Sequence, residues 1–317
     1  MAQILKATIP NLYLCKQALE NSKVIAVPTE TVYGLAGNAL DEEALKTIFL
    51  IKRRPLFNPL IIHTDCMKNA EKYGIFNALA RQLAKQFWPG PLTMILPKKE
   101  VVPNLVTANL DSVAIRCPQH PTFLQLLKRL SFPLAAPSAN PFGYVSPTSA
   151  EHVNCSLGEK LEFILDGADC EIGIESTVID CRGKNPIILR EGFITSEKIE
   201  EITNLKVVNK NLSDGLLSPG LLNKHYSPNT KVLINQKKYI VGSGCLSFGE
   251  LPKDFKNSKH HFNLSLSENL FEASHLLYEG LRYLDKYNLN FIQVLPIPNV
   301  GIGKAINDRL KRASFVE

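Results

Sequence analysis

The sequence lacks the long apolar runs and the paired cysteines that mark several large classes of protein. No apolar run approaches the roughly 18 residues that a membrane-spanning helix needs. The seven cysteines include no Cys-x-x-Cys pair, so neither a disulfide framework nor a zinc site is indicated. Residues 1–10 show no signal-peptide pattern. We therefore expect a cytoplasmic protein with reduced thiols and no membrane contact.

A strong charge bias is also missing. The chain has 36 lysines and arginines against 30 aspartates and glutamates, a net charge of +6. A dedicated nucleic-acid-binding protein would gather more positive charge on one face. The small excess suits an anionic small molecule and is compatible with loose contact to RNA. With 317 residues, of which 45% are hydrophobic, the chain can bury one large core and a second, smaller one.

Short β-rich runs alternate with helical patterns as far as residue 202, which predicts a twisted, mixed α/β sheet with helices. Asp41 is the expected N-cap of a helix that ends near Lys52, with Leu45, Ile48 and Phe49 on one face. Further helices are expected at residues 76–87, 122–130 and 149–155. Strands are expected at residues 24–27, 60–62, 92–96, 113–115, 134–136, 163–165, 177–179 and 187–189.

Residues 207–229 lose this periodicity and are rich in turn-forming residues, so we predict a linker that is long enough to serve as a binding loop. The linker separates a domain of residues 1–206 from a smaller α/β domain of residues 230–317. In the second domain, strands are expected at residues 231–234, 245–248 and 291–295. Helices are expected at residues 270–284, with Ser267 near the N-cap, and at 304–313.

Two short motifs carry side chains suited to phosphate chemistry. Lys52-Arg53-Arg54 follows the first predicted helix, and Ser138-Ala139-Asn140 follows the apolar run 133–137. Clustered cations beside strand ends neutralise and orient phosphate oxygens. A Lys-Arg-Arg run alone is more often a solvated surface loop, but the two motifs together predict a nucleotide site.

Seven segments, in order along the chain, resemble the YrdC/Sua5 family. They are residues 28–35, 52–63, 88–93, 114–118, 136–140, 176–178 and 225–228, and the last, His-Tyr-Ser-Pro, resembles the long Sua5 form. The resemblance implies a YrdC-like twisted mixed sheet joined by a linker to a smaller, Rossmann-like Sua5 domain. It also implies synthesis of threonylcarbamoyl-AMP and pyrophosphate from L-threonine, bicarbonate and ATP, the first step of tRNA t6A modification.

The resemblance further assigns roles to individual residues. Catalytic handling of the phosphates falls to Lys52, Arg54, Ser138 and Asn140. L-threonine contacts are implied at Thr31, His63, Arg116, Ala136 and Ser176, and ATP contacts at Arg54, Asn58, Ser112, Ser138, Ser146, Arg190 and Tyr226. Mg²⁺ is expected to be held mainly by ATP phosphates, without a metal site in the protein. The expected partners are tRNA threonylcarbamoyl transferase proteins, which would receive the product, and tRNA in weak contact.

Each assignment has a structural alternative. Arg116 ends an apolar strand and needs an anionic partner, which is either the substrate carboxylate or a carboxylate of the chain itself. His63 is otherwise a structural histidine. Tyr226 either covers the nucleotide or packs the linker onto its own domain; we expect residues 218–228 to lie across the pocket mouth. Two other functions stay open: a non-catalytic RNA-binding module, and a carbamoyl-adenylate-forming transferase related to hydrogenase maturation proteins.

Overall fold

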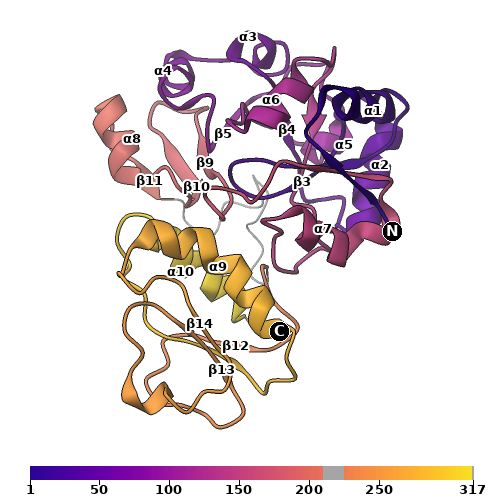
Figure 1. Cartoon of the computed structure of the whole chain (residues 1–317). Coiled ribbons are helices and arrows are strands. Elements are labelled where there is room, and N and C mark those ends of the chain that lie inside the picture. Colours follow the sequence, from indigo (N-terminus) through magenta and orange to yellow (C-terminus); the bar gives the residue numbers. More distant parts are fainter. Residues whose placement is uncertain (210–224, 316–317) are drawn as a thin grey trace.

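Two α/β units make up the fold, which is known from a computed structural model that describes residues 1–209 and 225–315. Figure 1 shows the N-terminal unit, indigo to pink, above the C-terminal unit, orange to yellow. None of the helices in these two ranges is long and apolar enough to cross a membrane. The predicted linker, 207–229, falls mostly on residues 210–224, which lie outside the described residues.

A mixed sheet forms the N-terminal unit, as the sequence predicted. Within the described ranges it has 11 strands in the order β1-β8-β2-β3-β7-β4-β6-β5-β9-β10-β11. β4 and β6 are parallel, and β5 runs antiparallel to β6 and parallel to β9. The carboxyl ends of β4 and β6 therefore meet the amino end of β9 at one edge. The strands are β1 (Gln3–Lys6), β2 (Ile25–Val27), β3 (Gly34–Asn38), β4 (Ile61–His63), β5 (Leu92–Pro97), β6 (Ser112–Arg116), β7 (Leu134–Ala135), β8 (Phe163–Asp166), β9 (Thr177–Asp180), β10 (Ile187–Arg190) and β11 (Val208–Asn209).

Helices pack around this sheet, and α2 (Glu42–Lys52) is the one that positions the basic motif. Asp41 caps α2 by accepting a hydrogen bond from the Glu43 amide, as predicted. Arg53 ends the helix with a left-handed backbone, φ 54°, which turns the chain sharply. The other helices of this unit are α1 (Ile9–Glu20), α3 (Met67–Ala70), α4 (Ala78–Phe87), α5 (Asn104–Thr107), α6 (Pro121–Leu127), α7 (Ala150–Leu157) and α8 (Ser196–Thr203).

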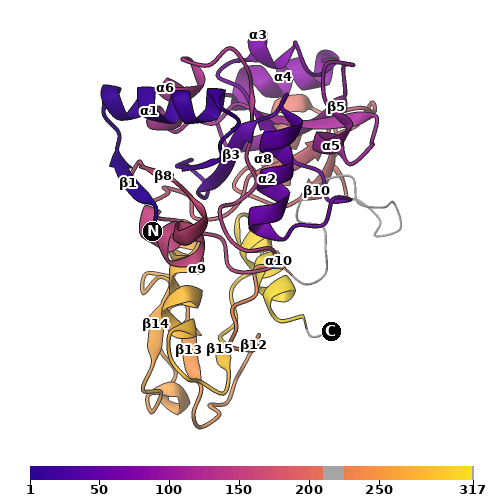
Figure 2. The same cartoon turned by 90° about the vertical axis from the view of Figure 1, so that its right-hand side faces the viewer.

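The C-terminal unit is a small parallel sheet in the order β12-β15-β13-β14. Its strands are β12 (Val232–Leu233), β13 (Gly244–Ser247), β14 (His261–Asn263) and β15 (Ile292–Val294). Figure 1 and Figure 2 show α9 (Leu270–Asp285) and α10 (Gly303–Ala313) on the side of this sheet that faces the N-terminal unit. Asn269 is the N-cap of α9, and Ser267, predicted near it, lies two residues earlier and bonds Glu272 through its hydroxyl.

The two units share a hydrophobic core. Ile172 and Ile174 of the N-terminal unit are buried in one cluster with Leu277, Leu281 and other side chains of α9 and α10. Gly173, between the two isoleucines, has φ 79°, and a Cβ there would lie 2.4 Å from the carbonyl oxygen of His275. Only glycine permits this approach. The C-terminal unit is thus fixed against the segment that leads into β9.

Candidate active site

A small pocket lies at the sheet edge where the carboxyl ends of β4, β6 and β10 meet the amino end of β9. Its cavity volume is about 50 Å³. Small-molecule sites usually have roughly 300–1,000 Å³, so this cavity is smaller than such sites usually are. Nine of the sequence-predicted site residues line the pocket: Thr31, Arg54, His63, Arg116, Ala136, Ser138, Ser176, Arg190 and Tyr226.

Arg116 enters the pocket from the end of β6 and has a carboxylate partner within the chain. Its Nη2 atom lies 2.8 Å from Glu30 Oε1, and both side chains are 4% exposed. Its Nη1 donates to Thr31 Oγ1 at 2.9 Å. Arg116 therefore has the carboxylate partner within the chain that one alternative required. It also lines the pocket, where the other alternative places a substrate carboxylate. Its contact with threonine stays a prediction.

The Thr29-to-Val32 turn after β2 presents the Thr31 hydroxyl to the pocket. Thr29 Oγ1 accepts hydrogen bonds from the amides of Thr31 and Val32 and lies 2.9 Å from Thr31 Oγ1. This serine/threonine-type turn fixes a tight bend without glycine. Gly34 follows in β3, where a Cβ would lie 3.2 Å from the Cβ of Ala136. Close approach of these two segments brings Thr31 and Ser138 to one pocket.

His63 ends β4 and is buried against Phe123, with ring centroids 5.6 Å apart. Burial, together with the positive charge of Arg116, lowers the pKa of His63 to about 3. The imidazole is therefore neutral near pH 7. It suits a shaping or hydrogen-bonding role in the pocket rather than charge neutralisation.

Replacing His63 with asparagine is expected to reduce the sensitivity of the fold to acid. The histidine is neutral in the folded chain down to a pKa of about 3, whereas the unfolded chain binds a proton near pH 6.5. The stability that the neutral His63 contributes is therefore fully present above pH 6.5 and is lost as the pH falls toward 3. Between pH 6.5 and pH 5 the wild-type chain should lose about 1–2 kcal/mol more than His63→Asn. Urea unfolding at both pH values measures this difference, and equal losses would contradict the burial of a neutral His63.

Arg54 reaches the pocket from the loop after α2. Its Nη2 donates to Asn58 Oδ1 at 2.6 Å and to the Pro59 carbonyl at 2.7 Å. Burial and the nearby Arg190 lower the pKa of Arg54 to about 9, so the guanidinium stays charged at neutral pH. Asn58 is outside the pocket lining, and its backbone and side-chain oxygens orient Arg54. Contact between Asn58 and ATP stays a prediction.

Lys52 does not line the pocket, unlike Arg54. It is 1% exposed, and its Nζ donates to the carbonyl oxygens of Ser138 and, at 2.6 Å, of Asn140. The Asn140 side chain donates to the Pro141 and Tyr144 carbonyls at 2.9 Å. In this arrangement Lys52 and Asn140 hold the loop that presents Ser138. Their direct contact with phosphate stays a prediction.

Ser112 and Ser146 are also outside the pocket lining. Ser112 begins β6, at the opposite end of the strand from Arg116. The Ser146 hydroxyl donates to Glu175 Oε1 at 2.7 Å. The ATP contacts assigned to these serines remain predictions.

Ser176 and Arg190 are bonded to each other in the pocket lining. The Arg190 guanidinium donates to the Ser176 carbonyl and, at 3.1 Å, to the Ser176 hydroxyl. Ser176 Oγ also lies 2.7 Å from Thr93 Oγ1. Glu175, directly before Ser176, lines the same pocket and was missed by the sequence reasoning. The sequence did contain a signal for a role of Glu175 in the site, because a carboxylate within an otherwise apolar run stands directly before a predicted site serine.

His225 and Tyr226, which follow the undescribed residues, also line the pocket. Tyr226 is 1% exposed and stacks on Tyr278 of α9 with ring centroids 5.8 Å apart. The His225 ring lies 5.8 Å from that of Phe142. Tyr226 thus packs on the C-terminal unit and also lines the pocket, and its contact with ATP stays a prediction. Residues 218–224 of the expected cover lie outside the described residues.

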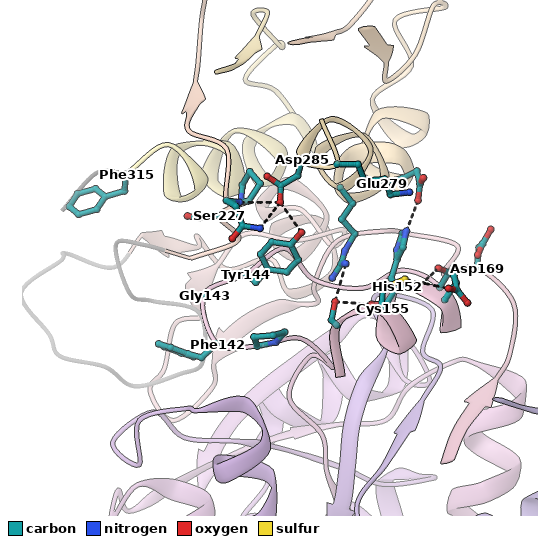
Figure 3. A pocket seen from close by; sticks show the side chains of 18 residues that line it. Phe142, Gly143, Tyr144, His152, Cys155, Asp169, Ser227, Glu279, Asp285 and Phe315 are labelled. Atoms are coloured by element: carbon teal, nitrogen blue, oxygen red, sulfur yellow. Dashed lines mark hydrogen bonds and ion pairs between the residues drawn. The ribbon is translucent and has the colours of Figure 1, made fainter. Parts of the chain in front are cut away.

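A second, larger cavity of about 1,610 Å³ lies between α7 and α9 (Figure 3). Ion pairs and hydrogen bonds cross it, such as His152 Nε2 to Glu279 Oε2 at 2.8 Å and Tyr144 Oη to Asp285 Oδ2 at 2.9 Å. The residues that line it include Glu151 and Asp169 and none of the predicted site residues. Its lining has four carboxylates against two cations, Arg282 and Lys286, whereas the smaller pocket has three arginines against one carboxylate. Because carboxylates repel phosphate, the smaller pocket is better suited to a nucleotide.

Comparison with known proteins shows the family of the chain. Residues 17–192 match the Sua5/YciO/YrdC family described as "Telomere recombination", and residues 194–314 match the C-terminal domain of threonylcarbamoyl-AMP synthase. Fold and pocket thus define a two-domain α/β protein with a YrdC-like N-terminal unit.

Full-length relatives make the assignment more specific. The chain is 37% identical to threonylcarbamoyl-AMP synthase of Pyrococcus abyssi, over 93% of this chain and 92% of the relative. It is 38% identical to the Bacillus subtilis enzyme of the same name, over 96% and 93%. Its fold matches the crystal structure of P. abyssi Sua5 complexed with L-threonine with a TM-score of 0.90 and 35% identity, covering 99% and 97% of the two chains. The chain belongs to the family of long, Sua5-type threonylcarbamoyl-AMP synthases.

Proposed function

We propose that the chain is an L-threonylcarbamoyladenylate synthase, which converts L-threonine, bicarbonate and ATP into threonylcarbamoyl-AMP and pyrophosphate. The observation that carries the proposal is the convergence of Arg54, Arg116 and Arg190 with hydroxyl groups in one buried pocket. Three guanidinium groups suit a carboxylate and a polyphosphate in one site. The identity of the substrates is inferred from membership of the threonylcarbamoyl-AMP synthase family.

The proposed reaction needs no nucleophilic side chain. The threonine amine captures bicarbonate as a carbamate with loss of water, and a carbamate oxygen then attacks the α-phosphorus of ATP. The bond from that phosphorus to the bridging oxygen breaks, and pyrophosphate leaves. Arg116 would orient the threonine carboxylate, and Arg54 would stabilise charge on the phosphates. Low solvent exposure in the pocket would protect the mixed anhydride from water.

Mg²⁺ is expected to arrive on the ATP phosphates. Among the described residues, no group of three or more His, Cys, Asp or Glu side chains could hold a metal ion. The Glu175 carboxylate in the pocket already accepts hydrogen bonds from three side chains. Mg²⁺ would be held mainly by phosphate oxygens of ATP and would neutralise part of their charge.

The product would serve tRNA t6A modification. The expected acceptors are tRNA threonylcarbamoyl transferase proteins in the cytoplasm, with weak contact to tRNA, and these remain predictions. The direct test of the proposed function is pyrophosphate release from ATP with the full chain. Release should require both L-threonine and bicarbonate. Binding of RNA without threonine-dependent release would favour the RNA-binding alternative.

L-threonine is expected to be used at least about a hundredfold better than L-alanine, compared as kcat/KM. The Thr31 hydroxyl is fixed by Thr29 and Arg116 and lines the pocket, where it can bond the substrate hydroxyl. Sites built to bond a hydroxyl reject analogues that lack it, because their own polar groups are left unpaired. Pyrophosphate release with each amino acid measures the ratio. Equal turnover would show that the pocket does not read the threonine side chain.

A further inference from the structure

Glu175 joins the substrate pocket to the C-terminal unit. Its carboxylate lies in the pocket lining and is 8% exposed. Oε1 accepts the hydrogen bond from Ser146, whereas Oε2 accepts one from Tyr278 Oη of α9 at 2.8 Å and one from Arg309 Nε of α10 at 3.2 Å. Two of the three donors therefore come from the C-terminal unit.

Arg309 is fully buried, and its guanidinium bonds both segments that carry Ser176 and Arg190. Besides the Glu175 carboxylate, it donates to the Glu175 carbonyl at 3.4 Å and to the Glu191 carbonyl. Glu175 directly precedes Ser176, and Glu191 directly follows Arg190. A planar, multidentate guanidinium is suited to fixing two chain segments at once. The same group lies 5.7 Å from the centre of the Tyr226 ring.

The charge of Glu175 matters because the pocket would receive phosphates. Burial raises its pKa, but the charges of Arg309 and Arg190 and the hydroxyls of Ser146 and Tyr278 prevail and hold the pKa below its usual value. The carboxylate is thus ionised at neutral pH. An uncompensated negative charge in this lining would repel ATP, and Arg309 compensates it from outside the pocket.

We propose that the C-terminal unit completes the ATP site through Arg309, a positioning residue that fixes the segments of Ser176 and Arg190 and balances the charge of Glu175. The proposal rests on the proposed function for its substrate. It gives the C-terminal unit a defined role in the site, although the described pocket lining contains no side chain of α9 or α10.

The test uses full-length variants and two measurements. Arg309→Met is expected to raise the KM for ATP at least tenfold and to weaken binding of a non-hydrolysable ATP analogue equally in calorimetry, with a smaller change in kcat. The double variant Glu175→Gln/Arg309→Met also removes the negative charge that Arg309 balances, so it should recover part of the ATP affinity that Arg309→Met loses. This recovery is the electrostatic signature, because loosened packing alone would not be relieved by a second substitution.

Lys304→Met is the matched control. Lys304 is another cation of α10 that bonds the N-terminal unit, at the Glu197 carboxylate and the Ser196 hydroxyl of α8, but it does not line the ATP pocket. The KM of this variant for ATP should change less than threefold. An equal rise in Lys304→Met and Arg309→Met, no recovery of ATP affinity in Glu175→Gln/Arg309→Met, or unchanged ATP affinity in Arg309→Met would each overturn the proposal.

Arg309→Lys covers the case in which Arg309→Met does not fold. Lysine keeps the positive charge but lacks the planar guanidinium that bonds Glu175 and Glu191 at the same time. The ATP affinity of this variant should therefore be lower than that of the wild-type chain by less than tenfold, and unchanged affinity would overturn the proposal. Calorimetry also separates the two hypotheses. A wild-type chain that binds the ATP analogue but shows no threonine-dependent pyrophosphate release would refute the proposed function and leave the role of Arg309 open to measurement.

Discussion

Arg54→Ala is expected to lower threonine-dependent pyrophosphate release by roughly 30- to 1,000-fold, a loss of about 2–4 kcal/mol of transition-state stabilisation. Arg54 is a buried, charged side chain of the pocket, held by Asn58 and Pro59. A fixed guanidinium stabilises charge that develops on phosphate oxygens, and alanine leaves that charge without a donor. Initial rates at saturating threonine and bicarbonate measure the effect.

Arg53→Ala provides the control for this loss. Arg53 is the adjacent cation, yet it is exposed and does not line the pocket. Its replacement removes the same formal charge, so a rate near that of wild type is expected. Thermal unfolding of both variants checks that the fold is retained. Near-normal release by Arg54→Ala, or an equal loss in Arg53→Ala, would remove the phosphate-binding assignment.

The different positions of Lys52 and Arg54 show where sequence reasoning succeeded and where it stopped short. The motif was correctly placed after a helix capped by Asp41, and Arg54 does line the pocket. Lys52, however, continues the buried face of α2 at the spacing that follows Ile48 and Phe49. That spacing was visible in the sequence. It was overlooked because a lysine in a basic run is usually read as a surface or ligand-binding cation.

Other features could not be read from local patterns. β3 contains two glycines, which weaken its strand signal, although Gly34 is needed for the close approach to Ala136. The bond between Arg309 and Glu175 joins residues 134 positions apart. Helical periodicity places Arg309 on α10 but does not reveal that a carboxylate of another domain neutralises it. Such pairings depend on the docking of the two units, which no single segment encodes.

Arg116→Met is expected both to destabilise the fold and to abolish measurable use of threonine. The substitution leaves Glu30 as an unpaired, buried carboxylate, which should cost about 3–5 kcal/mol of unfolding free energy. It also removes the guanidinium that lines the pocket beside Thr31. Urea unfolding and threonine-dependent pyrophosphate release measure the two effects separately.

The double variant Glu30→Gln/Arg116→Met separates a structural ion pair from a substrate site. Because it removes both charges of the buried pair, most of the lost stability should return. Threonine use should not return, since the substrate carboxylate still lacks its guanidinium. Recovery of turnover together with stability would mean that Arg116 serves only its partner Glu30. Glu30→Gln alone sharpens the distinction: it leaves Arg116 unpaired, so L-threonine, whose carboxylate can take the place of Glu30, should raise its unfolding temperature more than that of the wild-type chain.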